Sequence, residues 1–181
     1  YNVGTTSGDW YSGIADATGV PSSVMRDGTY RGYSFIDFKD NKYSIQYKAA
    51  GQPEGFQISL YVPKVIASRR NSARIAANFF MGSKNDLVEY RVDDGAWKPM
   101  AYTETMDPSF LQSVLRWDVA TELLQGRRPS NPEDSKHLWM AAFPGKLGLG
   151  KHRLQVRATD RYGKTHTAEQ EFEVKEPNPV P

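Results

Sequence analysis

The chain contains three histidines and no cysteine. Apart from its carboxylates, it therefore has few side chains that could bind a metal ion. The sequence predicts a hairpin turn at residues 161–163, which places His166 opposite Ala158. His152 then lies about six residues further along the same strand, roughly 20 Å away at ~3.3 Å per residue. Two side chains so far apart cannot bind one metal ion. We therefore predict no metal, no cofactor and no catalytic residue in this chain, whose third histidine is His137.

The remaining polar residues give no catalytic motif either. The sequence contains no GxSxG nucleophile motif, and no histidine stands where a catalytic triad could be argued. Asp37 and Asp40, like Asp93 and Asp94, fall at the ends of predicted hairpins. Carboxylates at such positions usually serve the turn itself.

Composition excludes several classes of partner. Lysine and arginine (23) nearly balance aspartate and glutamate (21), so no strong field attracts nucleic acid or an anionic membrane. No apolar stretch approaches the ~18 residues that cross a bilayer. We therefore expect neither nucleic acid nor a membrane as a partner.

The run from Met25 to Gly51 predicts a turn followed by a β-hairpin. Residues 33–38 are extended and aromatic, and Asp40-Asn41 can adopt the left-handed backbone of a tight turn. The return strand then places aromatic and aliphatic side chains on one face and polar ones on the other.

The same alternation recurs to the end of the chain. Short strands separated by polar turns predict an all-β fold, a β-sandwich of the immunoglobulin or fibronectin type III kind. Its apolar faces are carried by Phe56–Val62, Ile75–Phe79, Val88–Val92, Leu138–Met140, Leu154–Ala158 and Ala168–Val174. We assign residues 31–176 to this sandwich domain and residues 177–181 to a tail.

One segment departs from the β pattern. Asp107-Pro108 is a strong helix start, because Asp caps exposed amides and Pro suits the first turn. Apolar residues then recur at steps of three and four, and Gly126 supplies a stop. We predict one inserted helix at about residues 108–125, with Trp117 packing on the core.

Residues 1–30 form an extended segment without usable periodicity. A free tail is one interpretation. However, Trp10 and Tyr11 are unusual in a disordered tail, since low aromatic content marks disorder. The alternative is that this segment packs on another domain.

Four stretches carry a resemblance to a known family. The chain resembles the C-terminal region of a group of bacterial calcineurin-like phosphoesterases, where a DGTPNGY-type turn precedes a hairpin ending in YKAAG. Here Tyr30-Arg31 stand where the family usually has Pro-Asn. The stretches are SGDWYSG, MRDGTYRGYSFIDFKDNKYSIQYKAAG, FQISLYVP and SKHLWMAAFPGKLGLGKHRLQVRATDRYGKTHTAEQEFEV.

The resemblance implies an accessory, non-catalytic role for this chain. The family's metal-binding motifs, of the types DxH, GDxxD, GNH and GHxH, do not occur in it. Two divalent metals and hydrolysis of a phosphate ester are thus expected in an N-terminal metallophosphoesterase domain, the expected partner. Residues 1–30 are expected to pack on that domain. Trp10, Tyr11, Arg26 and Asp27 would border its substrate cleft, and the protein would be exported to the periplasm or cell surface.

An independent binding module, for carbohydrate or protein, is the alternative hypothesis. Four Trp and ten Tyr could supply aromatic faces that stack on sugars. Because Trp97 and Trp139 fall in predicted strands and Trp117 on a helix, packing in the core explains them more simply.

Overall fold

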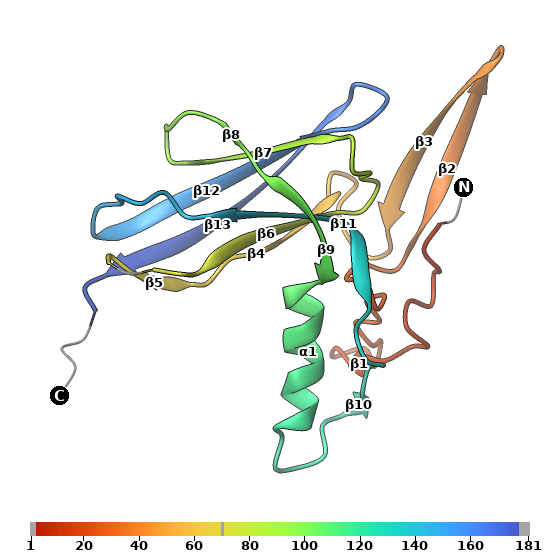
Figure 1. Cartoon of the computed structure of the whole chain (residues 1–181). Coiled ribbons are helices and arrows are strands. Elements are labelled where there is room, and N and C mark those ends of the chain that lie inside the picture. Colours follow the sequence, from red (N-terminus) through yellow and green to blue (C-terminus); the bar gives the residue numbers. More distant parts are fainter. Residues whose placement is uncertain (1–2, 70, 178–181) are drawn as a thin grey trace.

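Two facing β-sheets form the body of the protein in the computed structural model, which describes residues 3–69 and 71–177 (Figure 1). The first sheet has the strand order β4-β6-β11-β9 and the second β5-β13-β12-β7-β8. The all-β sandwich with one helix is confirmed, while the closer likeness to immunoglobulin or fibronectin type III domains stays a prediction. The strands of the two sheets are β4 (Ile58–Tyr61), β5 (Val65–Ala67), β6 (Arg74–Phe79), β7 (Leu87–Val92), β8 (Lys98–Pro99), β9 (Ala101–Met106), β11 (Asp134–Ala142), β12 (Gly150–Thr159) and β13 (Thr165–Lys175).

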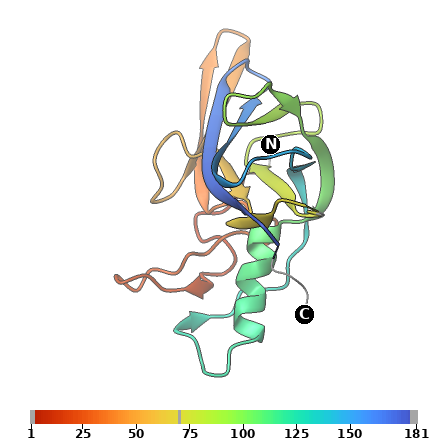
Figure 2. The ribbon, with the colours of Figure 1, turned by 90° about the vertical axis from the view of Figure 1, so that its left-hand side faces the viewer.

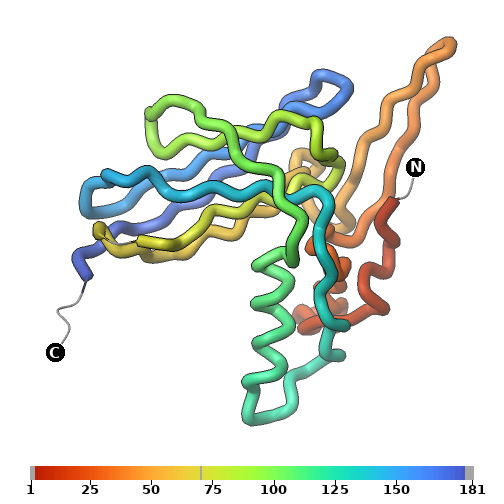
Figure 3. Tube along the Cα trace, viewed as in Figure 1, coloured from red at the N-terminus to blue at the C-terminus, as the bar shows by residue number. Residues whose placement is uncertain are grey.

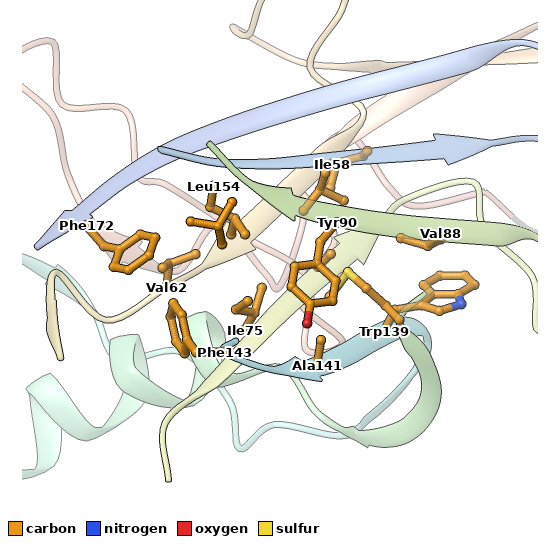
Figure 4. Packing of buried hydrophobic residues seen from close by; sticks show 14 of the residues in the cluster. Ile58, Val62, Ile75, Val88, Tyr90, Trp139, Ala141, Phe143, Leu154 and Phe172 are labelled. Carbon is orange, nitrogen blue, oxygen red and sulfur yellow. The ribbon is translucent and has the colours of Figure 1, made fainter. Parts of the chain in front are cut away.

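The main hydrophobic core lies between these sheets (Figure 4). Phe79 and Trp139 enter it from the first sheet, and Leu154 and Val156 from the second; all four side chains are almost fully buried. Burial of each such side chain contributes about 1.5–3 kcal/mol to stability. The core residues follow the predicted alternation along β6, β7, β12 and β13.

The hairpin of β12 and β13 has the predicted register. His166 pairs opposite Ala158, and the ladder continues to Gly150 opposite Val174. Leu154, Val156 and Ala158 are buried, while the residues between them on β12 lie on the outer face. Strand β12 therefore has one face packed in the core and one charged face that points outward.

The helix α1 (Pro108–Asp118) begins where the sequence predicts and ends earlier. The Asp107 side chain accepts a hydrogen bond from the amide of Phe110 at 2.9 Å, as expected of an N-cap. The prediction that the helix reaches residue 125 is wrong, because Val119 caps it. No helix in the described part of the chain is long and apolar enough to cross a membrane.

Tertiary pairing explains where the chain goes after the helix. Strand β10 (Gly126–Arg127) pairs antiparallel with β1 (Gly13–Ile14) of the N-terminal segment. Gly126 has φ of 119°, and a Cβ there would lie 2.3 Å from the carbonyl oxygen of Gly13. Gly126 is therefore needed for this close strand contact and not as a helix stop.

A third layer covers the outer face of the first sheet. Ala76, Asn78 and Leu138 point away from the main core, yet all three are buried. The N-terminal segment and α1 lie on this side of the sheet, at the end far from the C-terminus (Figures 2 and 3). The sandwich thus has one sheet that is covered on both faces near this end.

The predicted hairpin at residues 25–51 is confirmed as β2 (Gly32–Lys39) and β3 (Lys42–Ala49). The strands pair from Gly32 opposite Ala49 to Lys39 opposite Lys42, and Asp40 in the turn has φ of 53°. In Figure 1 this hairpin is a separate two-stranded sheet whose tip projects beyond the sandwich. Its base is fixed by a small cluster of Tyr47, Ala49 and Phe80. Of the predicted tail at 177–181, residues 178–181 lie outside the described residues.

Candidate functional site

The N-terminal segment is anchored to the sandwich by buried polar side chains. Asp9 and Ser12 are both buried, and Asp9 Oδ2 accepts hydrogen bonds from the Ser12 hydroxyl at 3.1 Å and the Ser130 amide at 2.7 Å. The Ser12 carbonyl in turn accepts from the amide of Ser23 at 2.8 Å. This segment therefore packs on its own domain, beside α1 and the chain that follows it.

Trp10 and Tyr11 stand out between these two anchors. Trp10 is 75% exposed and Tyr11 is 56% exposed. Their φ angles are 53° and 55°, in the left-handed region that bulky residues rarely adopt. The Arg31 guanidinium lies 5.7 Å from the centroid of the Tyr11 ring, which links this turn to the start of β2. Two large aromatic side chains are thus held outward on a strained turn.

A polar network joins the segment before β2 to the first sheet. Asn78 Nδ2 donates to the carbonyl of Asp27 at 3.0 Å and to Asp107 Oδ2 at 2.9 Å. The Asn78 oxygen lies 2.7 Å from His137 Nδ1. On the other side of the ring, His137 Nε2 lies 3.2 Å from both Asp27 Oδ2 and the Thr29 hydroxyl. The network therefore connects the N-terminal segment, β6, β11 and the start of α1.

The hydrogen bonds of Asn78 and Asp27 orient the side chains of this network. Because the Asn78 amide group already donates to two oxygens, its own oxygen must accept the proton on His137 Nδ1. Burial tends to raise the pKa of Asp27, but hydrogen bonds from His137 and the Thr29 amide and the charge of the imidazole outweigh it and hold the pKa below its ordinary value of 3.8. Asp27 is therefore an ionised anchor for the turn that precedes the hairpin.

This network forms one wall of a groove of about 530 Å³. The groove has the size of a small-molecule site. Lys136 and Arg161 line it together with His137, and neither cation forms an ion pair within the described residues. The only carboxylate among the lining residues is Asp27, which His137 and the Thr29 amide already engage. The groove thus has a net positive rim. Its apolar wall is formed by Met25, Tyr47, Phe80 and Met81.

The four residues predicted to border a cleft do not come together in one site of this chain. Asp27 lines the groove, whereas Trp10, Tyr11 and Arg26 do not. Arg26 donates to the carbonyl of Asn131 at 2.9 Å and pairs with Glu133 at 3.4 Å. Their role at the cleft of another domain stays a prediction.

Sequence reasoning missed the residues that hold Asp27 in place. Asn78 lies between Ala77 and Phe79 in β6, and its full burial requires polar partners. A lone asparagine between apolar neighbours was the available signal. No signal in the sequence pointed to His137, because its partners Asp27 and Asn78 are 110 and 59 residues away.

Each histidine is paired with an aspartate. Besides His137 with Asp27, His152 Nδ1 lies 2.7 Å from Asp93 Oδ2 and His166 Nε2 lies 3.0 Å from Asp160 Oδ2. The hydrogen bond to Asp93 raises the pKa of His152. These pairs lie at separate turns or strands. Among residues 3–69 and 71–177, no three His, Cys, Asp or Glu side chains gather closely enough to hold a metal ion. The described residues therefore do not fit the dinuclear metal centre that the family resemblance implies for the whole protein.

The tryptophans do not form an aromatic platform for a sugar. Trp139 is buried in the core and Trp97 lies beneath the guanidinium groups of Arg91 and Arg157, at 4.8 and 4.4 Å. Trp117 is half-buried on α1, so Trp10 is the one tryptophan of the described chain with a largely exposed side chain.

Comparison with known proteins identifies the family. No curated protein matches the sequence. Among solved structures, the chain is similar to CopC from Methylosinus trichosporium OB3b, with 11% identity over 82% of this chain and 99% of that chain and a TM-score of 0.31. A likeness this low carries no argument about function. The family model described as the C terminal of calcineurin-like phosphoesterase matches residues 1–166. The chain therefore belongs to the family of C-terminal domains of calcineurin-like phosphoesterases.

Proposed function

We propose that this chain is a non-catalytic accessory domain that docks on the phosphoesterase domain of the same protein and borders its active site. The family supports this proposal, since its members form the C-terminal part of phosphoesterases. The two divalent metals and the hydrolytic chemistry would then belong to the phosphoesterase domain. In agreement with the family resemblance, we further propose that the whole protein is exported.

The strained aromatic turn is the observation that carries the proposal. A left-handed backbone at a non-glycine residue costs about 1–3 kcal/mol and persists only where the surroundings enforce it. Here the buried neighbours Asp9 and Ser12 enforce it, and the result is that Trp10 and Tyr11 face outward. Exposed aromatic residues held in place by their neighbours are typical of the contact points of protein interfaces.

The groove supports the finer proposal that the domain borders an active site. Lys136 and Arg161 present two cations that no carboxylate of the described chain neutralises. Cations at the edge of a cleft attract anionic ligands such as a phosphate ester. The same groove contains Asp27, which the family resemblance implies at the border of the cleft.

The test is the double variant Trp10→Gly, Tyr11→Gly in the full-length protein. Glycine adopts the left-handed backbone without strain, so the turn keeps its path while both aromatic side chains are lost. We expect kcat/KM for a phosphate ester to fall about tenfold or more, because a displaced accessory domain misplaces the cleft. The melting temperature of the 181-residue chain carrying the same changes should not fall.

A matched control is Leu123→Gly, which removes a fully exposed apolar side chain in the loop that follows α1. It should leave kcat/KM unchanged. Unaltered kcat/KM in the double variant would contradict docking through this turn. Phosphatase activity in the 181-residue chain alone would contradict the accessory role altogether.

A further inference from the structure

We propose that the β2–β3 hairpin is the arm by which this chain grips the phosphoesterase domain that precedes it. This inference rests on the proposed accessory function and names the surface that performs it. It concerns a different element from the Trp10–Tyr11 turn, so the two can be tested separately.

Both faces of the hairpin carry exposed apolar side chains. Because directly opposed residues share a face, Phe38 and Tyr43 lie together, next to the pair Ile36 and Ile45. Along this face the exposed fraction rises from 8% at Ile45 to 45% at Ile36 and 78% at Phe38. An apolar stripe that begins under the cover of the sandwich thus continues beyond it.

The opposite face adds a second aromatic pair. The rings of Tyr33 and Phe35 are 5.4 Å apart, and both side chains are exposed. Those of Phe38 and Tyr43 are 6.3 Å apart on the first face. Apolar residues gathered on one projecting element mark an interaction site, whereas single exposed ones need no explanation.

The backbone of the hairpin also lacks support. Within the described chain, β2 and β3 form a sheet of their own, and neither pairs with another strand. An isolated two-stranded hairpin is only marginally stable in water, and unpaired edges tend to attract other chains. With eight residues in each strand at ~3.3 Å per residue, the arm reaches roughly 25 Å. An arm of this length and composition is suited to lie against a partner.

The position of the N-terminal segment identifies the preceding domain as that partner. The amide of Gly32, the first residue of β2, donates to the carbonyl of Thr5 at 3.3 Å. The beginning of the described chain therefore runs beside the base of the hairpin (Figure 1). In this family a phosphoesterase domain lies on the N-terminal side, so it reaches the hairpin first.

The charges of the turn argue against an anionic membrane as the occupant. Asp37 and Asp40 balance Lys39 and Lys42, so the tip has no excess of cations to attract acidic lipids.

The test compares hydrogen exchange at residues 34–44 in the full-length protein and in the 181-residue chain. Backbone amides of a covered hairpin open less often, so we expect them to exchange about tenfold or more slowly in the full-length protein. The variant Phe38→Asp should abolish this difference, since a charge at the contact disfavours docking. Equal exchange in the two parent proteins would overturn the proposal.

Val119→Asp is the matched control, because Val119 is 75% exposed, close to the 78% of Phe38, and lies at the end of α1. It should leave the protection of residues 34–44 intact. Equal loss of protection in both variants would overturn the assignment to the hairpin.

Two other occupants give different results, and either would overturn the proposal. Protection that appears in the 181-residue chain and grows with its concentration, with a dimer seen by light scattering, would indicate a second copy. Flotation of that chain with phosphatidylglycerol vesicles, lost in Phe38→Asp, would indicate a lipid surface. If the hairpin is unprotected while the Trp10→Gly, Tyr11→Gly variant still loses activity, the hairpin proposal fails and the accessory function stands.

Discussion

The two long hairpins of this protein have the same local construction and opposite surroundings. Strands β12 and β13 pair along their whole length, as β2 and β3 do. The β12–β13 pair, however, continues into β7 on one side and β5 on the other, and its inner face forms half of the core. Among residues 3–69 and 71–177, no further strand pairs with β2 or β3, and this hairpin exposes aromatic residues on both faces.

The difference lies in the outward-facing residues. On β12 the residues that alternate with the core are polar or charged, as in a strand with one face in water. On β2, Tyr33 and Phe35 are exposed on one face and Phe38 on the other. A strand that carries apolar residues on both faces is adapted to be covered on both, and the described part of the chain leaves Phe35 and Phe38 exposed. The β12–β13 hairpin thus contributes to the folding of the domain, whereas the β2–β3 hairpin presents apolar surface to a partner.

The largest effect should come from a charge placed on the buried face of β12, and the same charge placed on β2 serves as the comparison. Val156→Asp buries an unpaired carboxylate in the core, and we expect it to destabilise the chain by about 3–5 kcal/mol. Phe38→Asp puts the charge on an exposed side chain, so the free energy of unfolding should change by less than about 0.5 kcal/mol. Urea unfolding of the 181-residue chain, followed by circular dichroism, measures both.

Arg157→Ala controls for position on β12, because Arg157 adjoins Val156 and faces outward. It loses an ion pair of 2.7 Å with Glu89 and a stacking contact on Trp97. Both lie near the surface, so the expected loss is about 1 kcal/mol or less. If Val156→Asp and Arg157→Ala were equally destabilising, the assignment of inner and outer faces would be wrong.

Both hairpins were predictable from the sequence because their signals are local. Alternation with a period of two identified β12 and β13, and Asp40-Asn41 and residues 161–163 identified the turns. The N-terminus of α1 was equally local, since Asp107 and Pro108 act within one turn. For the same reason the sequence correctly predicted which residues of β12 and β13 face the core.

The features that sequence reasoning missed depend on long-range contacts. The end of α1 is set by the chain turning back so that β10 can pair with β1, about 110 residues earlier. The burial of Asn78 depends on a third layer that strand alternation does not predict. The Asp27–His137 contact joins residues on different elements, and neither has a motif that points to the other.

The second prediction concerns the anchor that holds the β2–β3 arm in place. Asn78→Ala removes the donor to the Asp27 carbonyl and to Asp107 Oδ2, and it also removes the oxygen that faces His137 Nδ1. We expect a loss of about 2–3 kcal/mol, the cost of buried unpaired polar groups. Hydrogen exchange should accelerate in residues 25–49 more than in β12 and β13. This result would show that the two hairpins open independently.

Asn71→Ala provides the matched control. Asn71 is exposed, and its side chain accepts a hydrogen bond from the amide of Ala73 at 2.8 Å. Its loss should cost about 1 kcal/mol or less and should not affect exchange in residues 25–49. Uniform acceleration in Asn78→Ala across both hairpins would instead mean that the domain opens as one unit.

The third prediction uses pH to distinguish the hairpins, since each depends on an aspartate paired with a histidine. Burial tends to raise the pKa of Asp160, as it does for Asp27, but hydrogen bonds from His166 and from the amides of Lys164 and Tyr162 hold that pKa below 3.8. A carboxylate with a lowered pKa in the folded state contributes stability that is present above its unfolded pKa. That stability is lost as the pH falls through the folded value. Both contributions should therefore be complete at pH 5, begin to fall near pH 4, and be lost once the pH lies below the lowered folded pKa.

Asp27→Asn and Asp160→Asn should each make the loss of stability between pH 5 and pH 2.5 shallower, because asparagine does not titrate. Urea midpoints at half-unit steps of pH measure the slope, and hydrogen exchange shows where each effect lies. We expect Asp27→Asn to reduce the acid sensitivity of residues 25–49 and Asp160→Asn that of the β12–β13 turn. An acid slope identical to that of the parent in both variants would show that other carboxylates control the transition. The two hairpins would then share one response to acid, although only one of them contributes to the main core.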